Sequence, residues 1–427
     1  MLSFVLKLLY QWLVHMAAGV MFIATAMRGV RDPQYRDRLP ERFGFTRLNF
    51  STSPIWIHAA SVGEVQAALP LIRRLLSNAE QRPILVTTTT PTGAARVQAV
   101  FAQQVQHAFL PYDTVGAVHR FLQRTQPHCL IIMETELWPH LLRACVTRQV
   151  PVMLVSARIS AKTASRYRCA RSLFAESFPS ISVAAQTTED QQRFLMLGAL
   201  PARTQVTGNL KFDIEVAAST IDSGKQIKQS LHGRPVWIAA STHTGEEEQV
   251  LQAHRQVLRH RPDALLILVP RHPQRFTQVM QLLDAQRFNY VARSGGQLPT
   301  VEHTVWLIDS VGELMSFYAA SDMAFVGGSL VPIGGHNLLE PAALAVPVLS
   351  GPSIFNAPEV ASLMIAQQAL CQVNSSDALA KAVIQLIDSP DRRSAMGNTA
   401  QRVVEQGRGA LASVLKLIQQ QAKITLP

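Results

Sequence analysis

The stretch IWIHAASVGEVQAALPLIRRLL, residues 55–76, joins a short apolar run directly to a helical pattern. Residues 55–59 are predicted to form a buried strand, and residues 65–76 carry apolar side chains at helical spacing. The small residues between them allow a tight turn from strand to helix. A strand that leads straight into a helix is the building unit of a parallel α/β sheet.

The same alternation continues through the chain in two blocks, which predicts two parallel-sheet domains with helices on both faces. The boundary is expected near residues 208–213, GNLKFD. Two such domains facing a cleft are the architecture of GT-B glycosyltransferases, although the pattern alone also allows a nucleotide-sugar epimerase or a glycogen phosphorylase relative. The further strands predicted are 84–88, 129–133, 152–156, 182–185 and 204–207, then 236–240, 264–269, 304–308, 323–326 and 346–349.

The amino-acid composition excludes several classes of protein. Hydrophobic residues make up 48% of the 427 residues and charged residues only 16%, which excludes a disordered chain. Four cysteines without a CxxC pair exclude a disulfide framework and a zinc site. The formal charge of +11 fits either a nucleic acid or an anionic membrane as partner. Because no basic run is interleaved with aromatic residues, no nucleic-acid partner is expected and an anionic membrane surface is favoured.

The amino terminus predicts how the membrane is reached. Residues 8–27 carry no charge and are long enough to cross a bilayer core of about 30 Å. Lys7, Gln11 and His15 share one helical face, which suits a helix in the interface or a span whose polar stripe packs on protein. A cleaved signal peptide is the alternative, because residues 24–26 imitate a cleavage site. The absence of a basic leader and the unpaired cysteines weigh against it.

The chain after this helix is rich in arginine, with Asp32, Asp37 and Glu41 as partial compensation. By the positive-inside rule this excess predicts that the bulk of the protein is cytoplasmic. The arginines are Arg28, Arg31, Arg36, Arg38, Arg42 and Arg47.

Acidic residues follow two predicted strands of the first block. Glu64 lies three residues after Ser61, the spacing of a helix capping box, and it also suits a general base. The helix amino terminus would lower the pKa of Glu64, whereas burial would raise it. Glu134 ends another strand and is expected to face the cleft, while Glu136 could instead interact with the dipole of the next helix. Glu134 and Glu136 are weak candidates for a pair of metal ligands, because no third ligand lies at a matching position.

Cations, hydroxyls and glycines follow other strands, where ligands bind in open α/β sheets. Arg158 is either a surface arginine or a ligand for an anion, and Ser241 and Thr242 precede a helix start that resembles an anion site. Arg271 and His272 lie between two prolines. Glycine-rich segments at 326–329 and 334–341 would let the backbone approach a phosphate, and Glu340 could accept hydrogen bonds from ribose hydroxyls. His336 and Glu340 lack a third metal ligand.

With these motifs assembled, the sequence resembles the 3-deoxy-D-manno-octulosonic acid (Kdo) transferases of glycosyltransferase family 30 over essentially the whole chain. The motifs that carry the resemblance are HAASVGE at 58–64, METELWP at 133–139, GNLKFD at 208–213, STHTGEEE at 241–248, PRHPQRF at 270–276 and VGGSLVPIGGHNLLEPAALAVPVLSGP at 326–352.

The resemblance implies transfer of Kdo from CMP-Kdo to the lipid A precursor lipid IVA, in lipopolysaccharide synthesis at the cytoplasmic face of the inner membrane. It implies an anchor helix at residues 1–30, an acceptor-binding domain at 31–210 and a CMP-Kdo-binding domain at 211–427. Inverting displacement without a metal or cofactor is expected. Another GT-B nucleotide-sugar transferase or epimerase, or a membrane-tethered nucleotide-binding scaffold, are the alternatives.

The resemblance also implies roles for individual residues. Glu64 is expected to be the catalytic base, with Glu134 and Lys211 stabilising the transition state. Further acceptor or donor contacts are expected from Ser61, Gly63, Arg158, Ser241 and Thr242. The residues expected to bind CMP are Arg271, His272, Gly312, Glu313, Leu314, Asn337, Leu338, Leu339 and Glu340.

Overall fold

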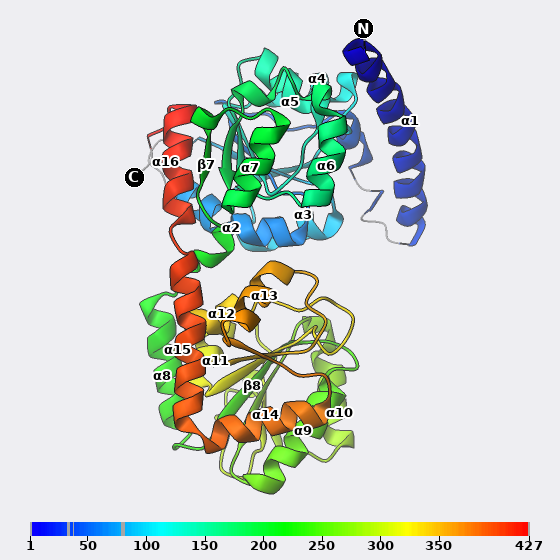
Figure 1. Ribbon diagram of the computed structural model, residues 1–427. Coiled ribbons are helices and arrows are strands. Elements are labelled where there is room, and N and C mark those ends of the chain that lie inside the picture. The colour runs from blue at the N-terminus through cyan, green and yellow to red at the C-terminus, as the bar shows by residue number, and fades with distance from the viewer. Residues whose placement is uncertain (1, 32–34, 37, 78–81, 426–427) are drawn as a thin grey trace. The chain divides into compact units, whose positions relative to one another are not determined.

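The computed structural model describes residues 2–31, 35–36, 38–77 and 82–425 (Figure 1). The chain forms two compact units, one made of Met1–Asp213 with Arg408–Pro427 and the other of Ile214–Gly407. Each unit is built around its own parallel sheet, and each is described here by itself.

The first unit contains a seven-stranded sheet in the order β3-β2-β1-β4-β5-β6-β7. Its strands pair in parallel, and the central ones are buried along their whole length because helices cover both faces. The strands are β1 (Ile55–His58), β2 (Ile84–Thr88), β3 (Gln106–Phe109), β4 (Cys129–Met133), β5 (Val152–Ala157), β6 (Ser182–Ala185) and β7 (Thr204–Val206).

Two apolar clusters lie on the two faces of this sheet. One joins the sheet to α2, α3 and α16, and the other joins it to α4, α5 and α7. The helices of this unit, after α1, are α2 (Val62–Leu76), α3 (Pro91–Phe101), α4 (Val115–Thr125), α5 (Pro139–Thr147), α6 (Ala161–Cys169), α7 (Thr188–Leu197) and α16 (Ala410–Ala422).

The second unit repeats this plan with a seven-stranded sheet in the order β10-β11-β9-β8-β12-β13-β14. Helices α9, α10 and α14 pack on one face, and α8 and α11 pack on the other. The strands are β8 (Val236–Thr242), β9 (Leu265–Pro270), β10 (Tyr290–Ala292), β11 (Val305–Leu307), β12 (Met323–Val326), β13 (Val348–Ser350) and β14 (Leu370–Gln372). The helices are α8 (Ala218–Ser230), α9 (Glu247–His260), α10 (Phe276–Ala285), α11 (Leu314–Ala320), α12 (Leu339–Ala343), α13 (Pro358–Ala366), α14 (Ser376–Asp388) and α15 (Pro390–Gly407).

The strand order reverses at one place in each sheet. In the first sheet β1 lies between β2 and β4, and in the second β8 lies between β9 and β12. Ligands of open α/β sheets bind beyond the carboxyl ends of the strands at such switch points. The loops after β1 and β4, and those after β8 and β12, are therefore where the functional residues of each unit are expected.

The predicted fold class is confirmed, and every strand predicted from the sequence is present with its ends within two residues. Three further strands, β3, β10 and β14, were not predicted, and all three are edge strands. Edge strands are partly exposed, and β3 (Gln106–Phe109) opens with two half-buried polar residues. They consequently lack the continuous apolar run that identifies a central strand of a parallel sheet.

The expected domain boundary at residues 210 and 211 needs correction at two places. Lys211 lies in the first unit, which extends to Asp213. The tail from Arg408 on also returns to the first unit instead of completing the second. Val414 and Ile418 of α16 are fully buried in the same apolar cluster as α2, and the Asp213 carboxylate accepts the backbone N–H groups of Gly409 and Leu411, both at 2.8 Å.

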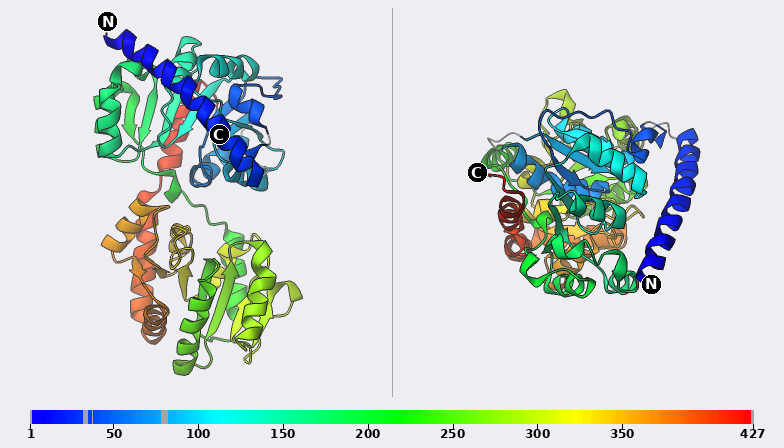
Figure 2. Two further views of the ribbon diagram at one scale, coloured as in Figure 1. Left: turned by 90° about the vertical axis from the view of Figure 1, so that its right-hand side faces the viewer. Right: turned by 90° about the horizontal axis from the view of Figure 1, so that it is seen from above.

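Helix α1 (Leu2–Arg31) lies against the first unit, and its segment Val5–Val30 is long and apolar enough to cross a membrane (Figure 2, left). The Tyr10 hydroxyl donates to the Asp113 carboxylate at 2.7 Å, and the Phe22 and Phe43 ring centroids are 5.7 Å apart. Two residues of the predicted polar stripe differ in their contacts. Lys7 pairs with Glu176 of the first unit, whereas the His15 ring, among the described contacts, bonds only the backbone of its own helix.

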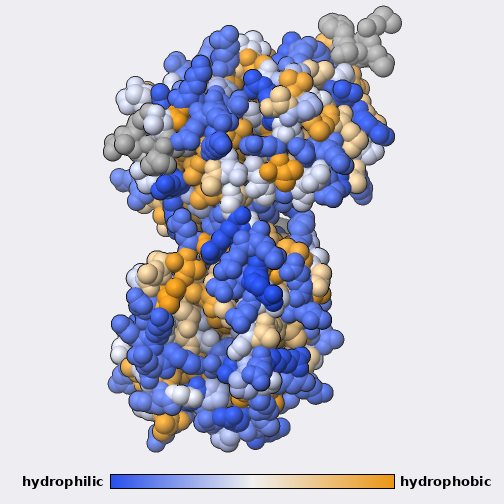
Figure 3. Space-filling model, turned by 60° about the vertical axis from the view of Figure 1, so that its left-hand side comes forward, coloured by the Kyte–Doolittle hydropathy of each residue, from blue (hydrophilic) through white to orange (hydrophobic). Residues whose placement is uncertain are grey.

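The opposite side of α1 is apolar and exposed. Trp12 is 72% exposed, Met16 62% and Val20 65%, at the four-residue spacing of one helical face. On the face of the molecule shown in Figure 3, by contrast, hydrophobic side chains form small groups between hydrophilic ones. The exposed row on α1 is a continuous apolar stripe, which suits contact with an apolar surface.

Part of the arginine-rich segment after α1 serves the fold. The guanidinium groups of Arg38 and Arg42 lie over the Phe109 ring, 5.3 Å and 4.3 Å from its centroid. Arg42 also donates to the backbone carbonyl of Thr89 at 2.6 Å. These two arginines are consequently engaged by protein, while Arg28, Arg36 and Arg47 are exposed. Asp32 and Asp37 lie outside the described residues, and the side chain of Arg31 is likewise not described.

Candidate active site

The loop after β1 places the Glu64 carboxylate against the start of α2. Ser61 caps the helix, its hydroxyl oxygen accepting the backbone N–H of Glu64 at 3.4 Å. The Glu64 carboxylate in turn accepts the Ala60 backbone N–H at 2.8 Å and the Ser61 hydroxyl at 3.3 Å. The capping geometry that the sequence predicted is thus present, with the carboxylate held at the carboxyl end of β1. Gly63 lies exposed beside it.

The electrostatic environment of Glu64 settles which of two opposing effects is larger. Burial raises its pKa from 4.5 to about 7, the Ala60 N–H and the Ser61 hydroxyl act against this rise, and the neighbouring charges of Glu134 and Glu136 add to it. Burial therefore outweighs the helix terminus. A carboxylate with a pKa near neutrality is well matched to accept a proton at physiological pH.

The loop after β4 carries the second carboxylate, Glu134, which is 8% exposed. One of its oxygens accepts the Lys211 ammonium at 2.8 Å, and the other accepts the Arg158 guanidinium at 2.7 Å. Burial alone would raise the pKa of Glu134, but these two cations outweigh it and hold the pKa below its usual value. Glu134 is therefore ionised, and the three groups together carry one net positive charge.

The backbone of this region is arranged to bring the ion pair together. Glu134 has a left-handed φ of +53°, and Ser156 at the end of β5 has a φ of +50°. Such conformations cost about 1–3 kcal/mol for residues other than glycine and cluster at functional sites. The Ser156 hydroxyl accepts the backbone N–H of Leu210 at 2.9 Å, which fixes the turn that carries Lys211.

The contact that Glu136 makes differs from the interaction with the dipole of the next helix that the sequence suggested. Helix α5 begins three residues later at Pro139, so Glu136 is not in its first turn. Its carboxylate instead accepts the Trp138 indole N–H at 2.7 Å, and burial raises its pKa. Glu64, Glu134 and Glu136 thus form a group of interacting carboxylates, in which the pKa of Glu134 is lowered and those of Glu64 and Glu136 are raised.

In the second unit, three histidines meet beyond the ends of β8 and β9. The Nε2 atoms of His243 and His336 are 2.8 Å apart and their rings are stacked, while His243 and His272 meet edge to face at 5.3 Å. Burial, together with the positive charge of Arg271, lowers the pKa of His243 to about 4 and that of His336 to about 3. The His243–His336 pair is accordingly neutral at pH 7.

The backbone N–H groups of the glycine-rich loop after β12 donate to a carboxylate of the protein itself, although the sequence predicted a phosphate there. The fully buried Glu246 carboxylate accepts the backbone N–H groups of Gly328, Ser329 and Leu330 at 2.6 Å, 3.0 Å and 2.9 Å. It also accepts the N–H of His243 at 3.2 Å. These donors are occupied by the protein itself, so this part of the loop shapes the site without offering free N–H groups to a ligand.

The residues expected to bind CMP lie in three loops of the second unit. Arg271 and His272 are exposed, and the backbone of Arg271 is fixed by the Thr242 carbonyl at 3.0 Å. Glu313 is paired with Arg293 at 2.9 Å, in the turn where Gly312 has a φ of +96° and from which Leu314 opens α11.

The third loop precedes α12. Asn337 accepts the backbone N–H of Leu339 and donates to Glu340, both at 3.1 Å. The side chains of Leu338 and Leu339 are buried, so only their backbone is available to a ligand.

Two further expected contacts, Ser241 and Thr242, end β8 at a register shift. Ser241 has a left-handed φ of +58°, and the Thr242 hydroxyl is buried without a hydrogen-bond partner. Arg275, which the sequence analysis gave no role, forms a bidentate ion pair with the buried Glu247 and adds positive charge beside the histidines. Within the described residues, no cluster of three His, Cys, Asp or Glu side chains suits a metal ion.

His243 and Arg275 were therefore missed as site residues, and His336 was considered only as a metal ligand. Their motifs, STHTGEEE, PRHPQRF and GGHN, were recognised, but the contact between segments 93 residues apart is visible only in the structure. The sequence signal that could have identified His243 is a histidine close after the end of a predicted strand.

Two parallel sheets of this topology, with polar residues gathered beyond the carboxyl ends of the strands at each switch point, are the arrangement of the GT-B fold. Comparison with solved structures agrees: a UDP-GlcNAc 2-epimerase from Neisseria meningitidis shares the fold at a TM-score of 0.55 and 15% identity, covering 86% of this chain and 100% of that one.

Comparison of sequences is more specific. The family described as 3-deoxy-D-manno-octulosonic-acid transferase (kdotransferase) matches residues 37–214, and glycosyl transferases group 1 matches residues 237–403. A 3-deoxy-D-manno-octulosonic acid transferase of Haemophilus influenzae is 44% identical over 91% of this chain and 92% of its own length. One from Bordetella pertussis is 38% identical over 89% of this chain and 91% of its own length. The chain belongs to the Kdo transferase family and is a glycosyltransferase.

Proposed function

We propose that this enzyme transfers Kdo from CMP-Kdo to a hydroxyl group of the lipid A precursor, with Glu64 as the general base. The observation that carries the proposal is the Glu64 carboxylate at the end of β1, whose pKa is raised to about 7 beside the cation pair on Glu134. Membership of the Kdo transferase family supplies the transferred sugar.

The proposed reaction is a single displacement. As Glu64 accepts the proton of the acceptor hydroxyl, the hydroxyl oxygen forms a bond to the anomeric carbon of Kdo. The bond from that carbon to the phosphate oxygen breaks, and its electron pair leaves with CMP. Attack from the side opposite the leaving group inverts the anomeric centre. General-base assistance of this kind contributes typically about 10²–10⁴ in rate.

Lys211 and Arg158 would stabilise negative charge in this reaction, either on the carboxylate of Kdo or on the departing phosphate. Glu134 is already ionised and engaged by both cations, so it is not the base. Its proposed part is to hold the two cations beside Glu64, which makes it a positioning residue. Preorganised cations of this kind act on charge that develops in the transition state.

The second unit is proposed to bind the CMP part of the donor. Arg271 and Arg275 supply positive charge. His272 and one member of the neutral His243–His336 pair supply ring N–H groups that hydrogen-bond a phosphate, because the other N–H of the pair joins the two rings. Glu313 and Glu340 are proposed to accept hydrogen bonds from the nucleoside. A CMP leaving group carries a single phosphate, whose charge these cations and donors suffice to neutralise, so no metal is invoked.

Attachment to the cytoplasmic face of the bacterial inner membrane is part of the same proposal. Helix α1 contacts the first unit at both Tyr10 and Phe22, twelve residues or about 18 Å apart. A helix that crosses a bilayer core of about 30 Å has no room for protein contacts along that length. The contacts therefore favour a helix lying in the interface, with Trp12, Met16 and Val20 toward the lipid.

The deciding experiment is mass spectrometry of lipid IVA after incubation with the full chain and CMP-Kdo in buffer containing EDTA. Addition of one or more Kdo units is the expected result. If the acceptor mass stays unchanged with CMP-Kdo but increases with a UDP-sugar, the proposed donor is wrong. If Kdo is transferred only after Mg²⁺ is restored, the metal-free mechanism is wrong.

A further inference from the structure

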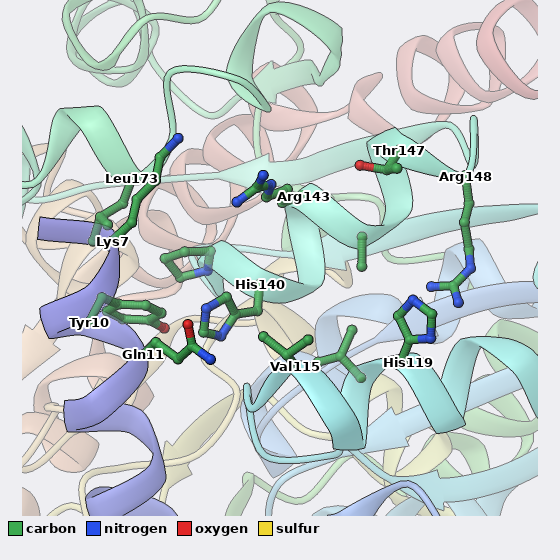
Figure 4. A pocket seen from close by; sticks show the side chains of 13 residues that line it. Lys7, Tyr10, Gln11, Val115, His119, His140, Arg143, Thr147, Arg148 and Leu173 are labelled. Atoms are coloured by element: carbon green, nitrogen blue, oxygen red, sulfur yellow. The ribbon is translucent and has the colours of Figure 1, made fainter. Parts of the chain in front are cut away.

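A cavity of about 390 Å³ lies where α1 packs on α4 and α5 (Figure 4). Its volume falls in the range of about 300–1,000 Å³ that is typical of small-ligand sites. Figure 4 shows Lys7, Tyr10 and Leu173 at one end, His119 and Arg148 at the other, and Arg143 between them. None of the proposed catalytic residues lines it, although Pro139, which directly follows the loop after β4, does.

The lining is basic and includes no aspartate or glutamate. Glu176 lies beside it and pairs with both Lys7 and Arg143, so one negative charge faces two positive ones there. Arg148, at the other end, has no carboxylate partner within the described residues, and His119 next to it is exposed. Asp113 lies behind the lining, where its carboxylate accepts the Tyr10 hydroxyl. Lys7, Arg143 and Arg148 thus outnumber the nearby carboxylates, and the cavity retains positive charge that an anionic group would offset.

The rest of the lining is partly apolar, and the helix that closes the cavity also carries a surface that suits lipid. Val118, Ala144 and Leu173 line the cavity, and α1, which closes it, exposes Trp12 and Leu13 one turn or less from Gln11 of the lining. A free inorganic anion gains nothing from apolar walls. An anion attached to an acyl chain gains from both the charge and the walls.

We propose that this cavity binds one anionic glycerophospholipid of the bilayer, with its phosphodiester at Arg148 and His119 and the start of an acyl chain between α1 and α5. The lipid would act as a wedge that fixes α1 to the first unit while the exposed face of α1 lies in the interface. The site contains no proposed catalytic residue, and its occupation is expected not to depend on Kdo transfer.

The test is native mass spectrometry of the full chain, released from nanodiscs that contain equal amounts of phosphatidylglycerol and phosphatidylcholine. The wild type is expected to retain one phosphatidylglycerol. Arg148→Gln should lower that retention about fivefold, the effect of one basic residue near an anionic lipid. Arg73→Gln removes an exposed arginine from α2, far along the chain from the cavity, and should leave retention unchanged.

A second variant tests whether lipid retention requires the space in the cavity as well as its charge. Ala144→Phe fills the space between α4 and α5 without altering any charged residue, and it should also abolish retention. Its thermal unfolding, followed by circular dichroism, shows whether the first unit remains folded. If it does not, Ala144→Leu, which adds less volume, is used and should lower retention in part.

Four results would overturn the proposal. They are equal retention of phosphatidylcholine, equal loss in Arg73→Gln, undiminished retention in a folded cavity-filling variant, and displacement of the lipid by inorganic phosphate. Displacement by one equivalent of lipid IVA would instead make the cavity part of the acceptor site. Kdo transfer is measured separately on the same samples, so failure of this proposal and failure of the proposed function are distinguishable.

Discussion

The Lys211 ammonium lies 2.8 Å from the Glu134 carboxylate, although 77 residues separate them in the chain. Arg158 completes the group from a third segment, 2.7 Å from the other carboxylate oxygen. Two cations and one buried anion thereby sit at the end of β4, beside the Glu64 carboxylate at the end of the neighbouring strand β1. The predictions below test what each member of this arrangement does.

Replacing Glu64 by glutamine should abolish most transfer while leaving the fold intact. Glutamine keeps the hydrogen bonds to Ala60 and Ser61 in part but cannot accept a proton, so kcat should fall by about 10²–10⁴. Glu136→Gln is the matched control, because an amide oxygen can still accept the Trp138 N–H, and its activity should stay within a few-fold of wild type. Near-normal turnover in Glu64→Gln would refute the base assignment.

The raised pKa of Glu64 gives activity and stability opposite dependences on pH. Activity should rise with pH to a plateau above about pH 7, because the carboxylate must be ionised to accept a proton. The folded protein holds this proton more tightly than the unfolded chain, so the contribution of Glu64 to stability falls between about pH 4.5 and pH 7. Urea unfolding of Glu64→Gln should accordingly show a larger gain over wild type at pH 8 than at pH 4.5. An equal difference at both pH values would mean that burial does not shift this group.

Glu134→Gln should destabilise the first unit, because it leaves two cations close together without their anion. The expected loss is roughly 1–3 kcal/mol at pH 7, below that of a fully buried pair because Arg158 and Lys211 are partly exposed. The folded-state pKa of Glu134 is depressed, so its stabilisation is present above about pH 4.5 and disappears as the pH falls through the folded value.

The urea-unfolding difference between wild type and Glu134→Gln should therefore shrink in acid. Glu176→Gln, whose exposed carboxylate pairs with Lys7 and Arg143, serves as the control and should cost less than about 1 kcal/mol. A Glu134 variant as stable as this control would show that the triad is not a structural clamp.

His336→Ala should weaken CMP binding while leaving the first unit unaffected. It removes the ring that stacks on His243 and fixes the proton of the pair, and loss of a hydrogen bond to a charged phosphate costs about 1.5–3 kcal/mol. Because the pKa values of His243 and His336 are about 4 and 3, wild-type CMP affinity should be nearly constant from pH 7 to pH 8, where the CMP phosphate is already largely a dianion.

Isothermal titration with CMP measures both effects. The control is His260→Gln, a half-exposed histidine on α9 that pairs with Asp388. A steep rise in affinity as the pH falls from 8 to 7 would show that a protonated histidine binds the phosphate, contrary to this prediction.

Met16→Glu on α1 should reduce binding to anionic vesicles by about tenfold or more, because a charge replaces an apolar side chain that is 62% exposed toward the proposed interface. Leu298→Glu, at an exposed apolar position in the second unit, is the control and should bind vesicles as the wild type does. Vesicle sedimentation measures both. Equal binding by Met16→Glu and wild type would place this face of α1 away from the lipid.

The sequence by itself determined the local features: the two series of buried strands, the capping residue Ser61, the apolar amino-terminal helix, and the motifs at the strand ends. These depend on neighbours within a few residues, and hydrophobic periodicity records them directly. It did not reveal edge strands such as β3, whose partial exposure weakens that periodicity.

The tertiary structure decided everything that depends on distant partners. The groups around Glu64 decide whether burial or the helix terminus has the larger effect on its pKa. Lys211 and Arg158 keep Glu134 ionised. Likewise Arg42 packs on Phe109 instead of facing lipid, and α16 returns to the first unit because Val414 and Ile418 complete its apolar core. Burial and charge pairing are set by groups far away in sequence, and for that reason no local pattern contains them.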